Sequence, residues 1–117
     1  MCYHLAMATI RLYETSNGSI PFETWYGALD ASVAARIQTA VVRMELGNLG
    51  DHKSVGGGVW EHRIHVGKGY RIYFGRDGNE LIVLLLGGSK ARQQAEIKKA
   101  KEYWADYKHR KRSESSE

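Results

Sequence analysis

The chain has 117 residues, of which 43% are hydrophobic, and this size predicts a single globular domain. It carries 17 Lys and Arg against 13 Asp and Glu, and the net charge of +4 favours an anionic partner, above all a nucleic acid. No apolar run approaches the ~18 residues of a membrane span, and the single cysteine, Cys2, cannot form an internal disulfide, so we expect a cytoplasmic protein without a thiol or zinc site.

The N-terminal half predicts one strand followed by a hairpin of two helices. Ile10 and Leu12 alternate with polar residues, which is typical of a half-buried strand. Pro21 stands at a first helical position, Asp30 can cap a second helix, and Gly47 can end it. The predicted elements, in chain order, are a strand over 9–14, a helix over 21–30 and a helix over 31–46.

The C-terminal half predicts three strands and a helix, which gives an α+β fold in one domain over 1–117. Glycines crowd the segment 47–58, which we interpret as a shaped loop, and the strands after it form a meander. The last strand is apolar on both faces and is expected inside the sheet. Ser89 is a candidate N-cap for the helix. The predicted elements are strands over 59–66, 70–75 and 80–86 and a helix from 90 to about 108, with residues 1–8 and 109–117 flexible.

The turn "GKG" at 67–69 decides how side chains meet on the predicted sheet. As a three-residue loop it pairs Val66 with Tyr70 and Ile64 with Ile72, and alternate residues then lie on opposite faces. The face expected to pack against the helices carries Trp60, His62, Ile64, Val66, Tyr70, Ile72 and Phe74. The opposite face, which we expect to be open to water, carries Glu61, Arg63, His65, Arg71 and Tyr73.

Arg63 and Arg71 are expected to lie close together on the open face, where like charges repel. Either Glu61 neutralises them within an ordinary solvated face, or an anion binds there. Guanidinium groups match phosphate oxygens and can stabilise the charge of a pentacoordinate transition state. Lys90, at the start of the last helix, and Lys53, in the glycine-rich segment, are placed to extend the same cationic rim.

Four segments, read in order, carry a resemblance to a known family: "GNLGDHK", "GVWEHRI", "GYRIYF" and "LLLGGSK". Over about residues 9–100 the chain resembles the addiction-module killer proteins, a HigB-like branch of the RelE/ParE toxin superfamily. The resemblance implies a RelE-like fold, with an N-terminal strand and two-helix hairpin on a small antiparallel or mixed sheet and a C-terminal helix. It also implies a type II toxin that is held in a hetero-oligomer by a helix-turn-helix antitoxin. Such toxins cut mRNA on the ribosome, through attack of a ribose 2′-OH on the adjacent phosphate, without a metal or other cofactor.

The resemblance further implies a catalytic set within this sequence. Arg71 matches the principal phosphate-binding arginine of the superfamily, Arg63 falls where a second strand cation is usual, and Lys90 matches a basic residue after the last strand. Glu61 is assigned the role of general base or of orienting Arg63, and Lys53 is a further candidate in the loop.

Three more residues complete the predicted RNA-binding set. His65 and Tyr73 share the face of the arginines, and Gln93 can position a group but cannot donate a proton as an acid. Several relatives carry a catalytic Tyr or His near the C-terminus, whereas the matching stretch "ARQQAEIKK" has neither. The acid for the leaving group is therefore unassigned.

Two other functions remain open at this point. One is a ParE-like inhibitor of DNA gyrase that acts by binding rather than by catalysis, although the pair Arg63 and Arg71 favours the nuclease. The other is a degenerate toxin that only binds its antitoxin.

Overall fold

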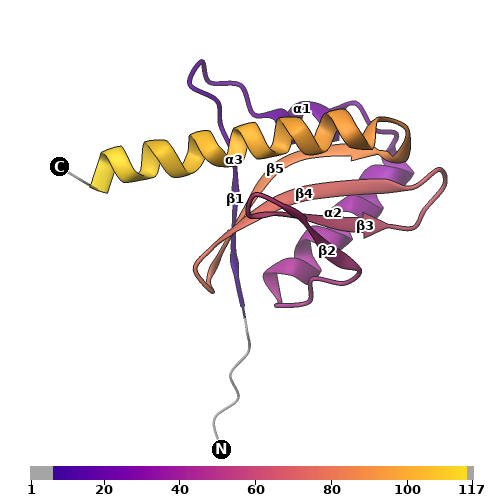
Figure 1. The fold of residues 1–117 in the computed structure, drawn as a ribbon. Helices are drawn as coiled ribbons and strands as arrows, with labels where there is room; N and C mark the ends of the chain where they lie inside the picture. Colours follow the sequence, from indigo (N-terminus) through magenta and orange to yellow (C-terminus); the bar gives the residue numbers. More distant parts are fainter. Residues whose placement is uncertain (1–6, 116–117) are drawn as a thin grey trace, which may run out of the picture.

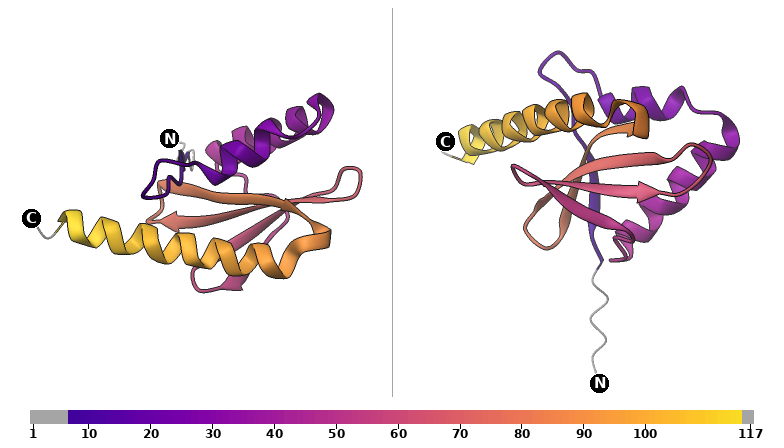
Figure 2. Two further views of the ribbon diagram at one scale, coloured as in Figure 1. Left: turned by 90° about the horizontal axis from the view of Figure 1, so that it is seen from above. Right: turned by 45° about the vertical axis from the view of Figure 1, so that its right-hand side comes forward.

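The structure, a computed structural model, describes residues 7–115 and shows a mixed five-stranded sheet between two helical layers (Figures 1 and 2). This arrangement confirms the predicted α+β class and the C-terminal helix. The strands are β1 (Thr9–Leu12), β2 (His52–Gly56), β3 (Val59–Ile64), β4 (Tyr70–Asp77) and β5 (Leu81–Ser89). The helices are α1 (Pro21–Gly27), α2 (Ala31–Glu45), the 3₁₀ turn η1 (Lys90–Arg92) and α3 (Gln93–Ser115).

The sheet has the strand order β1-β5-β4-β3-β2. The three strands from β3 to β5 form the predicted antiparallel meander, and β1 pairs with β5 in parallel. Helices α1 and α2 connect β1 to β2, the strand at the opposite edge of the sheet. The doubly apolar β5 lies between β1 and β4, so its predicted interior position is confirmed.

The termini of the first two helices follow the residues that predicted them. Pro21 begins α1, and the Asp30 carboxylate accepts a 3.0 Å hydrogen bond from the backbone N–H of Val33 at the start of α2. Gly47, with φ of +89°, stands just beyond the C-cap of α2, where a left-handed residue ends a helix at low cost.

Both faces of the sheet are covered, which corrects the prediction of one open face. Figure 2 (left) shows α1 and α2 on one side of the sheet and α3 on the other. The first core joins α1 and α2 to the sheet through Phe22, Val33, Ile37, Ala40, Met44, Ile64, Ile72, Phe74, Ile82 and Leu84. The second core joins α3 to the opposite face through Tyr13, Val59, Tyr73, Val83, Leu85, Ala100 and Trp104.

Two glycines allow α3 to lie close against the strands. A Cβ atom on Gly75 would come within 2.4 Å of the Trp104 ring, and one on Gly88 would come within 2.1 Å of the Glu96 carboxyl group. Because real side chains do not approach so closely, the packing of Trp104 requires glycine at position 75, whereas a side chain at position 88 would displace the Glu96 carboxyl group.

The pairing of β3 with β4 differs from the predicted register by two residues. Ile64 lies opposite Tyr70 and Arg63 lies directly opposite Arg71, so the connecting loop spans 65–69 rather than "GKG" alone. A shift of two residues leaves every side chain on its predicted face, because the side-chain period of a strand is two. Arg63 and Arg71 therefore share a face, as predicted.

Four elements extend further than the sequence predicted, two of them being β4, which ends at Asp77, and β5, which ends at Ser89. The glycine-rich segment contains the edge strand β2, which pairs with β3, rather than a loop throughout. Helix α3 continues to Ser115, through residues 109–115 that were expected to be flexible. Residues 1–6 and 116–117 lie outside the part that the structure describes, and within residues 7–115 no helix is both long and apolar enough to cross a lipid bilayer.

Candidate phosphate-binding site

The centre of the site is Glu61, a fully buried carboxylate on β3. Its Oε1 accepts a 3.2 Å hydrogen bond from Nε of Arg63, and its Oε2 accepts a 2.9 Å hydrogen bond from Nε2 of Gln93. Nε of Arg71 lies 3.3 Å from Oε2 as an ion pair. One carboxylate thus joins β3, β4 and the first turn of α3.

Glu61 holds both arginines by the inner nitrogen of the guanidinium group. Among residues 7–115, the outer Nη groups of Arg63 and Arg71 take part in no hydrogen bond, and the side chains are 32% and 12% exposed. The hydrogen bond to Glu61 orients the guanidinium group of Arg63, and the ion pair with Glu61 holds that of Arg71 beside it. The free Nη donors are therefore oriented for a ligand before any ligand binds.

The two arginines line a pocket of about 430 Å³ at the end of the β3–β4 hairpin. Three further side chains that can carry positive charge line the same pocket. They are His65, Lys68 and Lys90. The carboxylates that contact these lining side chains are Glu61 and Asp51, so the side chains that can carry positive charge outnumber them and the electrostatics favour an anion.

His65 belongs to this pocket but not to the strand. Strand β3 ends at Ile64, and His65 begins the connecting loop, where its Nε2 lies 2.7 Å from Oδ2 of Asp51. The hydrogen bond from His65 is the main cause that lowers the pKa of Asp51. The carboxylate fixes the orientation of the imidazole, and its Nδ1 has no partner within residues 7–115.

Three predicted RNA-binding residues do not line this pocket. Tyr73 is fully buried beneath α3, and burial, followed by the charges of Glu61 and Glu96, raises the pKa of its phenol. Gln93 is turned toward Glu61, and Lys53 lies opposite Glu61 on the edge strand β2. Direct contact of RNA with Tyr73 is therefore excluded in this conformation.

Two features of the site were not predicted. Lys68 of "GKG" joins the cationic pocket, which the position of the hairpin loop beside Arg71 could have indicated. Glu96 on α3 lies against Gly88, burial raises its pKa, and its Oε1 is buried without a hydrogen-bond partner in the described chain. Consecutive glycines in an interior strand were the available signal for this close contact.

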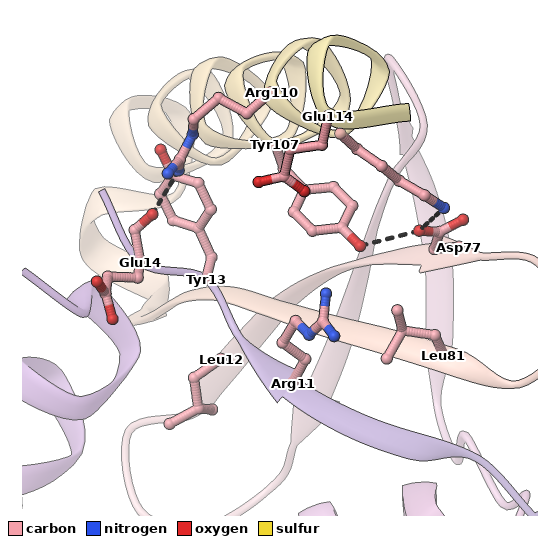
Figure 3. A pocket seen from close by; sticks show the side chains of 10 residues that line it. Arg11, Leu12, Tyr13, Glu14, Asp77, Leu81, Tyr107, Arg110 and Glu114 are labelled. Carbon is pink, nitrogen blue, oxygen red and sulfur yellow. Dashed lines mark hydrogen bonds and ion pairs between the residues drawn. The ribbon is translucent and has the colours of Figure 1, made fainter. Parts of the chain in front are cut away.

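A second charged pocket, of about 540 Å³, lies at the far end of α3 (Figure 3). Two of its cations are engaged: Lys111 pairs with Asp77, and Arg110 lies 2.8 Å from Asp106, whereas Arg11 lines the pocket as well. Tyr107 also donates a 2.9 Å hydrogen bond to Asp77. These contacts tie α3 to the sheet, and they are best explained as structural.

Tyr13 in this region predicts how stability depends on alkaline pH. Its phenol is 3% exposed and donates a 2.5 Å hydrogen bond to Asp106, and burial followed by that bond raises its pKa to about 12. A tyrosine whose pKa is raised by folding stabilises the folded state. This contribution is complete at pH values below the unfolded-state pKa of about 10, and it is lost as the pH rises from 10 through 12. The Tyr13→Phe variant should therefore lose less free energy of unfolding over this range than the wild type, in denaturant titrations at successive pH values. Equal pH dependence of the two proteins would contradict the assignment.

Comparisons with known proteins place the site inside the region that matches a protein family. The family described as "Phage derived protein Gp49-like (DUF891)" matches residues 24–104, which include every residue of the pocket. An uncharacterised protein of Haemophilus influenzae (strain Rd) is 39% identical over 84 residues, which cover 71% of this chain and 85% of that protein. The chain belongs to the Gp49-like family of phage-derived proteins, a family associated with the toxins of toxin–antitoxin systems.

Proposed function

We propose that this protein is the toxin of a type II toxin–antitoxin system and inhibits translation by cutting mRNA on the ribosome, as RelE- and HigB-like toxins do. The observation that carries the proposal is the pair Arg63 and Arg71, whose Nε atoms are held by Glu61 and whose Nη donors are free in one pocket. The order of elements is compatible with a RelE-like fold, and the family association supports a helix-turn-helix antitoxin as the partner.

The proposed reaction needs no group beyond the RNA, water and the side chains of the pocket. The Nη donors of Arg63 and Arg71 bind the non-bridging oxygens of the scissile phosphate and stabilise the charge of the pentacoordinate transition state. The ribose 2′-OH attacks phosphorus, the bond from phosphorus to O5′ breaks, and the departing O5′ takes a proton from water, which leaves a 2′,3′-cyclic phosphate and a 5′-hydroxyl end. Lys90, on the rim, stabilises the negative charge on the departing oxygen.

His65 is the proton acceptor in this proposal, and Glu61 is the residue that positions the arginines. Both oxygens of Glu61 are occupied by Arg63, Arg71 and Gln93, and its side chain is inaccessible to water. His65, in contrast, lines the pocket, and its bond to Asp51 leaves Nδ1 available to take the 2′-OH proton.

Cleavage on programmed ribosomes tests the proposal. Purified protein is added to ribosomes stalled on a defined mRNA, and the 5′ ends of the RNA are mapped by primer extension. We expect new ends within the ribosome-bound codon, each with a 5′-hydroxyl. Intact mRNA at full ribosome occupancy, together with inhibition of gyrase in a supercoiling assay, would replace the nuclease by the binding function.

Substitution of Glu61 by glutamine tests whether Glu61 positions the two arginines or acts as the general base. An amide offers one acceptor oxygen where the carboxylate offers two, so one donor among Arg63, Arg71 and Gln93 loses its partner. We expect the free energy of unfolding to fall by about 1–3 kcal/mol, and RNA binding at low salt to tighten because the arginines lose their counter-charge.

The pH profile of the Glu61→Gln variant gives the decisive measurement. Cleavage should be slower, but its rate should keep the rising limb with pH that a general base produces, because that base is His65. The matched Glu102→Gln variant, on the solvent side of α3, should match the wild type in cleavage and RNA binding. A flat profile for Glu61→Gln with normal stability would identify Glu61 as the base instead.

A further inference from the structure

A larger cationic pocket adjoins the phosphate-binding site on the side of α2. It has a volume of about 630 Å³ and lies between α2, the segment 48–51 and the end of β3. Its charged and titratable lining residues are Arg36, Arg43, Asp51, His62, Arg63 and His65. Most of these side chains can carry positive charge, so the pocket suits an anionic ligand.

The two arginines of α2 are uncompensated. Arg36 and Arg43 lie seven residues apart, about 10 Å along the helix axis and on nearly the same side of it. Neither forms an ion pair with any residue in the range 7–115. Asp51, the carboxylate that lines this pocket, is already bound to His65. Two free guanidinium groups therefore face the pocket without an internal partner.

His62 gives a second, independent sign of a ligand. Its side chain lines the same pocket and is 7% exposed, and its Nδ1 is buried with no hydrogen-bond partner among the described residues. Burial lowers the pKa of this imidazole, so the neutral ring offers one donor or acceptor nitrogen. An unsatisfied buried nitrogen is costly, and a polar ligand would satisfy it.

The two cationic pockets adjoin each other, because Arg63, Ile64 and His65 line both of them. Single-stranded RNA carries a phosphate at every nucleotide, and proteins follow such a strand with a basic groove. The occupant that fits two adjoining anion pockets is one RNA strand.

We propose that the pocket of Arg36, Arg43 and His62 binds a phosphate of the same RNA strand, next to the phosphate held by Arg63 and Arg71. This subsite rests on the proposed function and deepens it. It makes the substrate a strand of at least three nucleotides, with Arg63 between the two phosphates.

The test measures how RNA affinity depends on strand length. Fluorescently labelled 2′-O-methyl RNA, which cannot be cleaved by 2′-OH attack, is prepared with one phosphodiester and with five, and binding is followed by anisotropy. The variant is Arg36→Gln/Arg43→Gln. The matched control is Arg76→Gln/Lys98→Gln, which removes the same charge from two exposed side chains that line neither pocket.

Wild type and control should bind the longer RNA more tightly than the dinucleotide. The Arg36→Gln/Arg43→Gln variant should lose this gain, with a salt slope of log K lower by about 0.7 for the lost phosphate, and should bind the dinucleotide like the wild type. Unchanged affinity for the longer RNA overturns the subsite, as does an equal loss for both lengths. Unchanged RNA binding with lost inhibition by antitoxin would assign the surface to a protein partner and also overturn it.

Failure of the subsite proposal can be distinguished from failure of the proposed nuclease activity. If the length-dependent gain is lost in the variant but the wild type never cuts mRNA on ribosomes, the subsite stands and the nuclease fails. If the wild type cuts mRNA and the variant cuts and binds equally well, the nuclease stands and the subsite fails.

Discussion

Replacement of Arg71 by lysine is expected to slow mRNA cleavage by about 100- to 1,000-fold, the usual effect of removing one donor that stabilises transition-state charge. Lysine keeps the positive charge beside Glu61 but offers a single ammonium in place of a planar fork. The Nε atom that Glu61 orients and the Nη donors that bind phosphate are both lost. Single-turnover cleavage on programmed ribosomes measures the effect.

Lysine is the informative substitution at position 71 because alanine would disturb the fold. The sequence suggested that Arg71 faces water, but the side chain is only 12% exposed and pairs with a fully buried carboxylate. The Arg71→Lys variant should unfold at nearly the wild-type denaturant concentration. The control Arg76→Lys, on the same strand but outside the pocket, should cleave normally. Normal cleavage by Arg71→Lys would remove Arg71 from the catalytic set.

Substitution of His65 by glutamine should lower the single-turnover rate by about 100-fold, the lower end of the usual contribution of general base catalysis. Glutamine can still hydrogen-bond Asp51 but cannot accept the 2′-OH proton near neutral pH. The rising limb of the pH–rate profile should therefore disappear in this variant. RNA affinity should change little, because the phosphate contacts come from the arginines.

Two companion variants show whether His65 acts as a base or as a surface contact. Asp51→Asn should keep the rising limb but lower the rate, because the carboxylate that orients the His65 ring is lost. His52→Gln removes the neighbouring imidazole, which packs on Trp60 outside the pocket, and should leave the profile unchanged. A His65→Gln variant with the wild-type profile would refute the assignment.

The sequence predicted which side chains share a face but not what covers that face. Alternation placed Glu61, Arg63, Arg71 and Tyr73 together, and a register error of two residues did not disturb this result. The same face also carries Val83 of β5. Because β5 is apolar on both of its faces, the sequence already required a layer that covers each face of the sheet. The expectation of open water on this face was inconsistent with that signal.

Other features carried too little local signal to be predicted. The edge strand β2 consists mainly of polar and half-exposed residues, so it lacks the apolar alternation that marks a strand. Its turn into β3 depends on Gly56, Gly57 and Gly58, all with positive φ, which a sequence pattern cannot distinguish from an irregular loop. The bond between His65 and Asp51 joins residues 14 positions apart and depends on this hairpin.

Helix α3 separates its own C-terminal end from the phosphate-binding site by a long distance. It begins at Gln93, against the Glu61 carboxylate, and runs without a break to Ser115, which at 1.5 Å per residue is a distance of about 33 Å. Figure 1 shows this helix as a straight rod that projects beyond the sheet. A fluorophore or immobilisation tag attached at the last turn of α3 would lie far from Arg63 and Arg71. RNA-binding kinetics could therefore be recorded on surface-tethered protein without steric interference at the arginines.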